Sequence, residues 1–337
     1  MTEKDIQEIS ELLSSHKRIA ITTHQFPDGD AMGSSLALYH YLKLRGHSAS
    51  VVVPTYYPDF LHWMPGDEEV TNYMTHQHKA LALLEQAEIL FCLDYNQPGR
   101  TKGLADTVEN FEGTKILIDH HPNPGEFADY TLSVIEASST AELIYEFILM
   151  MNDETLIDAN IATCVYSGIL TDTGSFSYGS TTYRAHYVAG EMIKAGADNL
   201  SIQNEIFNSN SEDRVRLMGY ALSERLTILT EFNTGYISLS IDDLARFNFQ
   251  NGDTEGLVNY ILSIKGISFA VLMLERDKSV KCSFRSIGQF PSNEVAREHF
   301  NGGGHTNASG GEHSGPLAEA EKLFRSVLPQ YKKQLGR

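Results

Sequence analysis

Short apolar runs in the first part of the chain limit its fold more than any other feature. Each is rich in aliphatic residues and is followed by turn-forming or charged residues, as is typical of buried strands. The predicted strands are residues 19–21, 49–53, 89–93 and 115–118. Helical spacing of apolar residues occurs at residues 6–13, 31–44, 140–151 and 158–170. Strands that alternate with helices form βαβ units, so we expect an α/β fold whose mainly parallel sheet has helices on both faces.

Two of these predicted helices are preceded by polar residues that can cap a helix N-terminus. Asp30 is the expected cap of the helix that begins at Ala31, and Ser138 or Ser139 is the expected cap of the helix that begins at Thr140. Side-chain oxygens at this position accept hydrogen bonds from the first free backbone N–H groups.

The pattern changes after residue 183. Helical spacing dominates residues 184–224, with Gly196 as a break, and strands then resume closer together. These strands, at 226–229, 236–241, 268–274 and 279–284, are followed by a glycine-rich segment at 301–311 and a terminal helix at 317–334. With about 150 residues per domain, the 337 residues fit two domains. We expect a catalytic domain at 1–190, a helical linker at 191–225, and a smaller α/β domain with a mixed sheet at 226–337.

The net charge of −18 argues against tight binding to long nucleic acid, which requires many lysine and arginine contacts to phosphates. A small phosphate ester remains compatible with this charge, because bound metal ions reverse the local field. No apolar run approaches the ~18 residues of a membrane span, and no signal peptide is evident. The three cysteines lie in apolar surroundings, which indicates a cytoplasmic protein with reduced thiols. The oligomeric state stays open between a monomer and a homodimer.

Acids and histidines follow three of the predicted strands. They are His24, Asp28, Asp30, Asp94, Asp119, His120 and His121, and Asp172 ends the helical pattern at 158–170. The carboxyl ends of parallel strands meet at one edge of a sheet, so these groups should converge. Each acid alone could be a turn or helix cap, but several together would repel unless cations were bound. The four charges of Asp28, Asp30, Asp94 and Asp172 balance two divalent ions, which together can clamp a displacement at phosphorus.

The glycine-rich segment has the residue types of an anion-binding loop. Its glycines, Gly302 to Gly304, let the backbone approach a ligand and present N–H groups to an anion. His305 and Ser309 add side-chain donors, and Arg285, on the preceding strand, offers a two-pronged contact to phosphate. A flexible turn is the alternative interpretation of the glycines.

Five motifs in a fixed order resemble those of one protein superfamily. HQFPDGDAMGS, LDYN, IDHHPNPG and GILTDTGSF are similar to the four motifs of the DHH phosphoesterases, and NGGGHTNASGG after SFRS resembles the glycine motif of the DHHA1-type C-terminal domain. The motifs span residues 24–311, which is most of the chain. The resemblance implies a DHH domain, a DHHA1 domain and an active-site cleft between them.

The resemblance also implies a role for each matching residue. Two divalent ions are expected, with Mn²⁺ favoured and Mg²⁺ or Co²⁺ as alternatives. Their ligands would be His24 and Asp28 for the first ion, Asp30, His120 and Asp172 for the second, and Asp94 as a bridge. Asp119 would orient a histidine, and His121 would contact the phosphate or help to protonate the leaving oxygen. The nucleophile would be a bridging hydroxide, and the substrate contacts would come from Arg285, Gly303, Gly304, His305 and Ser309.

Within the superfamily, the compact length and the glycine motif resemble the nano-RNase and pAp phosphatase group. This resemblance implies hydrolysis of two- to five-nucleotide RNA to mononucleotides, removal of the 3′-phosphate of 3′-phosphoadenosine 5′-phosphate (pAp), or both. The alternative is a phosphodiesterase for cyclic di-AMP or linear pApA. A manganese pyrophosphatase and a non-catalytic nucleotide-binding module are less favoured. The sequence does not rank the substrates, fix the ion or give the polarity of cleavage.

Overall fold

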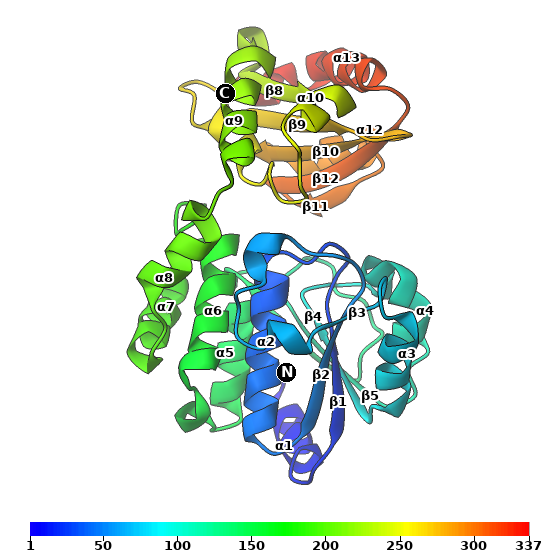
Figure 1. Cartoon of the computed structure of the whole chain (residues 1–337), viewed down its shortest axis with the longest axis vertical. Helices are drawn as coiled ribbons and strands as arrows, with labels where there is room; N and C mark the ends of the chain where they lie inside the picture. The colour runs from blue at the N-terminus through cyan, green and yellow to red at the C-terminus, as the bar shows by residue number, and fades with distance from the viewer. Residues whose placement is uncertain (337) are drawn as a thin grey trace. The chain divides into compact units, whose positions relative to one another are not determined.

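A computed structural model describes residues 1–336 of the chain (Figure 1). The chain divides into two compact units between Ser209 and Asn210, and each unit has its own sheet and its own apolar core.

The first unit is built on a six-stranded sheet in the order β3-β2-β1-β4-β5-β6, in which every neighbouring pair is parallel. Its strands are β1 (Arg18–Thr22), β2 (Ser48–Val53), β3 (Thr71–Asn72), β4 (Ile89–Leu93), β5 (Thr114–Asp119) and β6 (Tyr130–Ser133). The parallel sheet confirms the prediction. β3 and β6 were not predicted, because one has two residues and the other is only partly buried, so neither leaves an apolar run.

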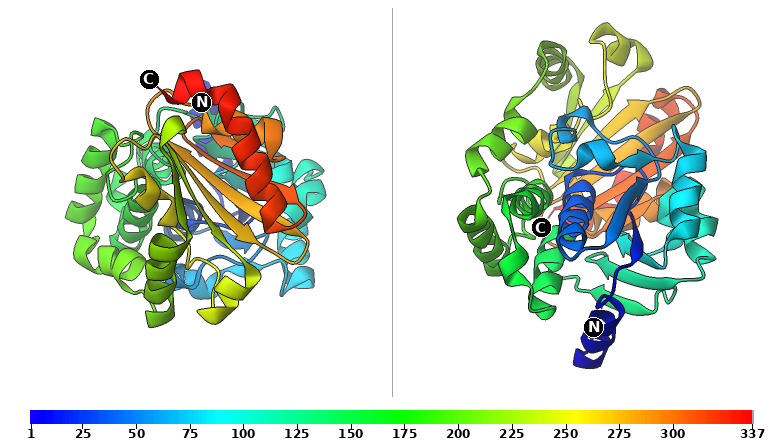
Figure 2. Two further views of the ribbon diagram at one scale, coloured as in Figure 1. Left: turned by 90° about the horizontal axis from the view of Figure 1, so that it is seen from above. Right: turned by 60° about the horizontal axis from the view of Figure 1, so that its bottom comes forward.

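Helices cover both faces of this sheet, as predicted (Figure 2, right). They are α1 (Glu3–Leu12), α2 (Gly29–Leu44), α3 (Gln77–Gln86), α4 (Ala105–Glu109), α5 (Thr140–Met150), α6 (Ala159–Asp172), α7 (Tyr183–Ala195) and α8 (Asn199–Gln203). Alternate strand residues point to opposite faces. Ile21 and Phe91 therefore pack with α1, α2, α5, α6 and α7, whereas Ala20 and Cys92 pack with α3 and α4.

The start of α2 differs from the prediction. Asp28, not Asp30, is the N-cap, and its Oδ1 accepts hydrogen bonds from the backbone N–H groups of Asp30 and Ala31. Asp30 lies inside the first turn, so its carboxylate is available for other contacts. At the start of α5, Ser139 is the cap, as one of the two expected serines.

Glycines allow α2, α5 and α6 to pack at backbone distance. A Cβ atom at Gly33 of α2 would lie 2.6 Å from the carbonyl oxygen of Cys164 in α6. A Cβ atom at Gly168 of α6 would lie 2.5 Å from the Cβ of Ala141 in α5 and 2.9 Å from Oδ1 of Asp30. All three distances are too short for real contacts of a Cβ atom, so only glycine fits at these two positions. This packing brings the first turn of α2 against the last turns of α6.

The second unit contains a mixed sheet in the order β11-β12-β10-β9-β8-β7. β8 and β9 are parallel and the other neighbours are antiparallel, which confirms the predicted mixed sheet. Its strands are β7 (Leu226–Leu229), β8 (Thr234–Leu239), β9 (Phe269–Glu275), β10 (Ser279–Ser286), β11 (Gly303–His305) and β12 (Ala308–Ser314). Its helices are α9 (Glu212–Tyr220), α10 (Ile241–Arg246), α11 (Leu257–Leu262), α12 (Ser292–His299) and α13 (Leu317–Leu335). α12 and α13 cover one face, with α13 lying along the sheet in Figure 2 (left), and α9, α10 and α11 cover the other.

The glycine-rich segment is a β-hairpin rather than an open loop. β11 pairs with β12, and Gly304 has φ +135° with no room for a Cβ, which would lie 2.7 Å from the carbonyl oxygen of Ala308. The N–H of Gly302 donates to the carbonyl oxygen of Ala296, so it is not presented to a ligand as expected. Glycine is required at Gly302 and Gly304 by the packing of the hairpin itself.

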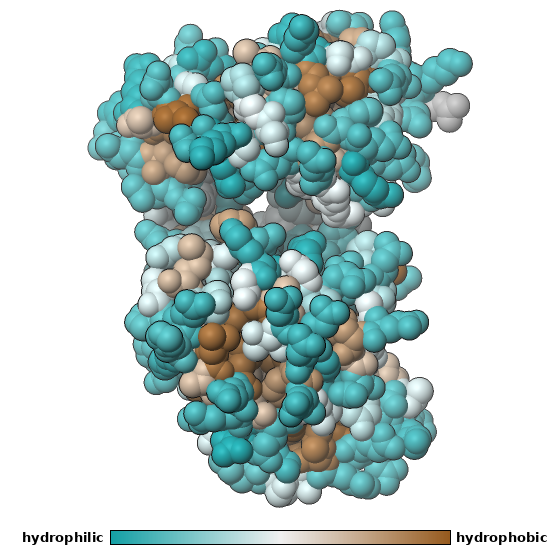
Figure 3. Space-filling model, turned by 90° about the vertical axis from the view of Figure 1, so that its right-hand side faces the viewer, coloured by the Kyte–Doolittle hydropathy of each residue, from teal (hydrophilic) through white to brown (hydrophobic). Residues whose placement is uncertain are grey.

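The face of the molecule drawn in Figure 3 is mainly hydrophilic, with small separate apolar patches. No helix among residues 1–336 combines the length and the apolar composition needed to cross a membrane.

The packing of α6 predicts a large difference between two glycine substitutions. Gly168→Ala should lower the free energy of unfolding by about 1–3 kcal/mol, because the added methyl group overpacks the contact with α5 and Asp30. Gly190→Ala, on α7, is the matched control, since its Cβ would have no heavy atom within 4 Å. It should be neutral or stabilise the protein by about 0.4–1 kcal/mol. Chemical denaturation of both variants measures the difference, and equal effects would contradict the packing argument.

Candidate metal centre

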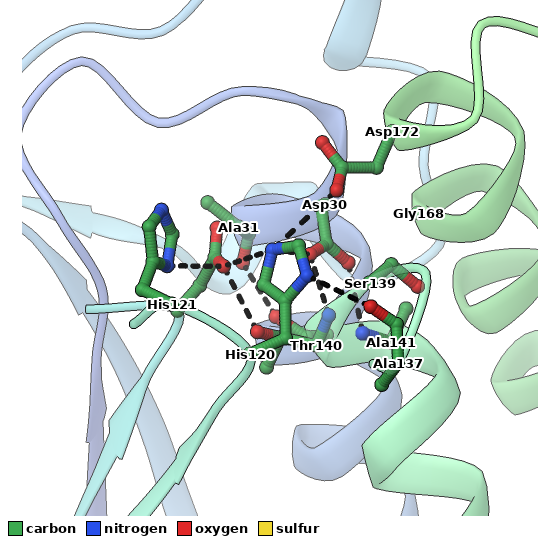
Figure 4. Close-up of polar contacts among 12 residues, drawn as sticks. Asp30, Ala31, His120, His121, Ala137, Ser139, Thr140, Ala141, Gly168 and Asp172 are labelled. Carbon is green, nitrogen blue, oxygen red and sulfur yellow. Dashed lines mark hydrogen bonds and ion pairs between the residues drawn. The ribbon is translucent and has the colours of Figure 1, made fainter. Parts of the chain in front are cut away.

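The residues predicted to form a metal site in the first unit lie together. Asp94 follows β4, His120 and His121 follow β5, and Asp172 ends α6, while the loop after β1 brings in the rest. Figure 4 shows His120 and His121 side by side, with Asp30 and Asp172 reaching toward His120 from α2 and α6. The common edge of the parallel strands produces this convergence.

Asp94 is the centre of the arrangement, because its two oxygens face different groups. Its Oδ2 lies 3.3 Å from Nε2 of His24. Its Oδ1 lies 3.6 Å from Nε2 of His120, 3.6 Å from Nδ1 of His121, and accepts a hydrogen bond of 2.9 Å from the hydroxyl of Thr140. Asp94 is buried and has φ +62°, in the left-handed region that non-glycine residues rarely adopt. Asp94 thus has an uncommon backbone conformation at the point where its side chain meets the cluster.

One group of atoms that could hold a metal ion comes from Asp30, His120 and Asp172. Nε2 of His120 lies 3.4 Å from Oδ2 of Asp172 and 3.8 Å from Oδ2 of Asp30. The N-terminus of α5 holds Asp30, since the backbone N–H groups of Thr140 and Ala141 donate to its two carboxylate oxygens at 2.7 and 2.8 Å. A negative charge at a helix N-terminus is favourable. The local fold therefore places this carboxylate without needing a basic side chain.

A second group consists of His24, Asp28 and Asp94. Nδ1 of His24 lies 2.8 Å from the carbonyl oxygen of Gln25, which leaves Nε2 directed at Asp94 and, at 3.9 Å, at Asp28. Asp28 thus contributes to the group while it caps α2. The sequence joins the two groups within one short loop, because Asp30 follows Asp28 by two residues.

Asp119 and His121 form a buried pair beside these groups. Nδ1 of His121 lies 2.8 Å from Oδ1 of Asp119, and the same two residues with Asp94 form another group that could hold a metal ion. Oδ2 of Asp119 is buried and has no hydrogen-bond partner among the described residues. A carboxylate on one ring nitrogen fixes the tautomer and the orientation of a histidine.

The electrostatics of the cluster indicate a site that attracts positive charge. Burial would raise the pKa of Asp94, but its hydrogen bond with His24 and the charges of the site histidines outweigh burial, so this pKa lies below the usual value. Burial and the neighbouring carboxylates raise the pKa of Asp172 to about 6, and that of Asp30 well above its usual value. Burial would lower the pKa of His24, but Asp94 and Asp28 raise it to about 9.

These observations fit divalent ions. The donor atoms are carboxylate oxygens and imidazole nitrogens, which suit Mn²⁺, Mg²⁺ and similar ions. In each group they lie within 4.8 Å of one another. The raised pKa values of Asp30, Asp172 and His24 favour protons at these groups, and bound cations would compete with those protons.

The five residues predicted to contact substrate all lie in the second unit. Arg285 is near the end of β10, where it pairs with Ala308 of β12. The others are on the glycine hairpin: Gly303, Gly304 and His305 on β11, and Ser309 on β12. Ser309 is buried, and its hydroxyl lies 3.3 Å from the hydroxyl of Ser292 at the start of α12. The hairpin and β10 therefore bring these residues to neighbouring strands.

Thr140 was missed by the sequence reasoning. It contacts both Asp30 and Asp94, through its backbone N–H and its hydroxyl. The expected helix start after Ser139 was the available signal, because the first N–H groups of a helix are free to bind an anion.

Comparisons with known proteins agree with this architecture. A family model described as the DHH family, N-terminal domain, matches residues 18–169, and a model of the DHHA1 domain matches residues 233–334. A protein of Thermus thermophilus named bifunctional oligoribonuclease and PAP phosphatase NrnA is 31% identical over 95% of this chain and 90% of the relative. The chain belongs to the DHH family.

Other relatives of this DHH protein cover it nearly completely. An exopolyphosphatase-related protein from Bacteroides fragilis has a solved structure with a TM-score of 0.95, at 40% identity over 100% of this chain and 98% of that one. The cyclic-di-AMP phosphodiesterase PdeA of Listeria monocytogenes is 30% identical over 96% of this chain but only 49% of its own length. The structure of exonuclease RecJ bound to manganese matches at a TM-score of 0.52 and 15% identity, a similarity of fold.

The raised pKa of His24 can be tested in chelator-treated protein. Because the folded-state pKa rises from the usual 6.5 to about 9, protonated His24 stabilises the fold below pH 6.5, and this contribution is lost as the pH rises through about 9. Asp94→Asn removes the hydrogen-bonded charge and should lower the pKa of His24. Asp59→Asn, which changes an exposed acid at the start of a short 3₁₀ helix (Asp59–Leu61), should leave the pKa of His24 unchanged. NMR titration of the imidazole measures both, and a His24 pKa that is unaffected by Asp94→Asn would contradict the assigned cause.

Proposed function

We propose that the chain is a metal-dependent phosphoesterase that hydrolyses short oligoribonucleotides to mononucleotides and removes the 3′-phosphate of pAp. One observation carries the proposal: Asp94 presents one oxygen to the group of His24 and Asp28, and the other to His120. A carboxylate that serves two liganding groups suits a pair of ions that act on one phosphate. The curated relatives from Thermus thermophilus and Bacillus subtilis, both named bifunctional oligoribonuclease and PAP phosphatase NrnA, support this choice of substrates.

Two divalent ions are proposed, with Mn²⁺ favoured over Mg²⁺ and Co²⁺. The first would be held by His24 and Asp28, the second by Asp30, His120 and Asp172, and both by Asp94. When bound, such ions neutralise phosphate charge and lower the pKa of a bound water. The solved structures of RecJ, which share the fold, are described as complexes with Mn²⁺ or Mg²⁺, and this agrees with the oxygen-rich donor set.

His121 is the proposed proton carrier and phosphate contact. Nδ1 of His121 lies 2.8 Å from Oδ1 of Asp119, and this contact orients the ring for the proposed role. Thr140 and Ala141 hold Asp30 in place through backbone N–H groups, so the site is preorganised by α5.

The second unit is proposed to anchor the terminal phosphate or nucleotide. The guanidinium of Arg285 suits a phosphate, and the hairpin residues Gly303, Gly304, His305 and Ser309 add backbone and side-chain donors. A substrate of two to five nucleotides needs few such contacts, which agrees with the net charge of −18.

Hydrolysis of cyclic di-AMP or pApA is the second candidate. It is favoured by the 30% identity to PdeA over 96% of this chain, although that relative is about twice as long. The two candidates share the proposed metal ligands and differ in the base-recognition surface. A rate comparison with Mn²⁺ across two- to five-nucleotide RNA, pAp, pApA, cyclic di-AMP and pyrophosphate ranks them.

Substitution of Asp94 tests the metal centre. Asp94→Asn keeps the shape of the side chain but removes its charge. Loss of a residue that only supports a metal ligand costs about ten- to a hundredfold, so loss of a direct ligand should lower turnover of short RNA and pAp at least about a hundredfold. Calorimetry with Mn²⁺ should show weaker binding. Asp59→Asn is the control and should retain activity. Near-normal turnover by Asp94→Asn would refute the two-ion assignment.

The proposed anchor is tested at Arg285. Arg285→Ala should raise KM for short RNA about ten- to a hundredfold, as expected for lost charge-assisted hydrogen bonds worth about 1.5–3 kcal/mol, with kcat changed much less. Arg276→Ala, at the turn between β9 and β10 and thus at the other end of β10, is the control. An unchanged KM for Arg285→Ala would remove Arg285 from the substrate site.

A further inference from the structure

An exposed aromatic side chain lies in the middle of the loop that carries His24 and Asp28. Phe26 is 51% exposed, although large apolar side chains are usually buried. Its φ is +54°, in the left-handed region where a bulky residue is an outlier. A solvated turn at this position would favour glycine or asparagine, which adopt this conformation with less strain. The combination of backbone strain and exposure indicates that the ring serves to contact a ligand rather than to stabilise the fold.

Two hydrogen bonds fix the loop in this conformation. The N–H of Gln25 donates to the carbonyl oxygen of Arg100 at 2.8 Å, and the N–H of Phe26 donates to the hydroxyl of Thr55 at 2.6 Å. Arg100 belongs to the segment after β4, and Thr55 follows β2. The loop after β1 is therefore hydrogen-bonded to the segments that follow the two strands beside β1. Strained conformations persist only when the surroundings determine them, and they cluster at ligand-binding positions. Phe26 is therefore held in place beside the liganding groups.

Positive charge accompanies the ring. Nζ of Lys102 lies 5.3 Å from the centroid of the Phe26 ring, within the range of a cation–π contact. Lys102 is exposed and has a left-handed φ of +50°. Arg100, two residues earlier, lies near enough to His24 for its positive charge to oppose, in small part, the rise in the pKa of that histidine. In a chain with a net charge of −18, two cations beside a cluster of acids provide contacts for an anion that also reaches that cluster.

An aromatic face with a neighbouring cation is the surface that binds single-stranded nucleotides, because a base stacks on the ring and the cation contacts the phosphate. We propose that Phe26 stacks against the nucleobase next to the scissile phosphate and that Lys102 contacts a phosphate of the same substrate. This subsite deepens the proposed function and rests on it. It accepts any base, since stacking does not depend on the hydrogen-bonding edge.

Substitution of Phe26 tests the stacking. Phe26→Ala should raise KM for a diribonucleotide about tenfold, which corresponds to about 1.4 kcal/mol, with kcat and Mn²⁺ affinity little changed. Phe26→Trp should keep KM near the wild-type value, because its ring can also stack on a base. Both variants keep a Cβ, so they have the same backbone strain and differ only in the ring. Leu44→Ala is the control: Leu44 is 50% exposed, but it ends α2, about 22 Å along the helix from Gly29.

Two abasic dinucleotides, each lacking one base, identify the contact. For one of them, wild-type protein should already show the raised KM, and Phe26→Ala should add no further increase, because the stacked base is missing. An equal effect of Phe26→Ala on both abasic substrates and on the intact diribonucleotide would overturn the proposal. An unchanged KM for Phe26→Ala with the intact substrate would overturn it as well.

The failure of this inference is distinct from that of the proposed function. If wild-type protein cleaves the diribonucleotide and the Phe26 variants match it, the subsite alone is wrong. If wild-type protein cleaves none of the substrates, the function itself is wrong. Lys102→Ala should raise KM and weaken its dependence on salt, whereas Lys102→Arg should preserve both. An unchanged salt dependence for Lys102→Ala would remove Lys102 from the subsite.

Discussion

The structure of the first unit depends on how it accommodates several carboxylates at one edge of a sheet. Asp94 is stabilised by histidines on both of its oxygens, and Asp30 by the N-terminus of α5. Burial and the neighbouring carboxylates still raise the pKa of both Asp30 and Asp172, that of Asp172 to about 6, so the protein alone does not fully compensate these two charges. Burying several acids without cations is unfavourable. The fold tolerates it because backbone N–H groups and imidazole rings interact favourably with the carboxylates.

The arrangement of helices around the site follows from the same requirement. Asp30 and Asp172 belong to helices that must approach closely before their carboxylates can reach one histidine. Glycines at Gly33 and Gly168 provide that approach, at the expense of the conformational freedom that glycine loses on folding. The apolar cores then hold the helices against the sheet, so the site is rigid because the packing around it is.

Much of this could be predicted from the sequence, and the exceptions have physical causes. Buried strands such as β4 were predicted at their observed bounds, since an apolar run of five residues leaves a clear signal. β3 and β6 leave none, because their pairing depends on neighbouring strands rather than on their own composition. The site residues were predicted from strand ends and from the family motifs, and Asp30 was placed correctly near the site but wrongly as a cap. The contacts of Thr140 with Asp94 and of the Phe26 backbone with Thr55 were not predicted, because each joins residues distant in the sequence.

The division of the chain into two units separates two kinds of chemistry. The six proposed metal ligands, His24, Asp28, Asp30, Asp94, His120 and Asp172, lie before residue 209, and every residue proposed to anchor the substrate on the glycine hairpin lies after it. Under the proposed function, the reaction and the recognition of the far end of the substrate would be encoded in different segments with different cores. Changes in the hairpin could alter which phosphate ester is preferred while the reaction stays the same. A scaffold of this kind can acquire new substrates by exchanging or remodelling one module, without rebuilding the buried charges of the other.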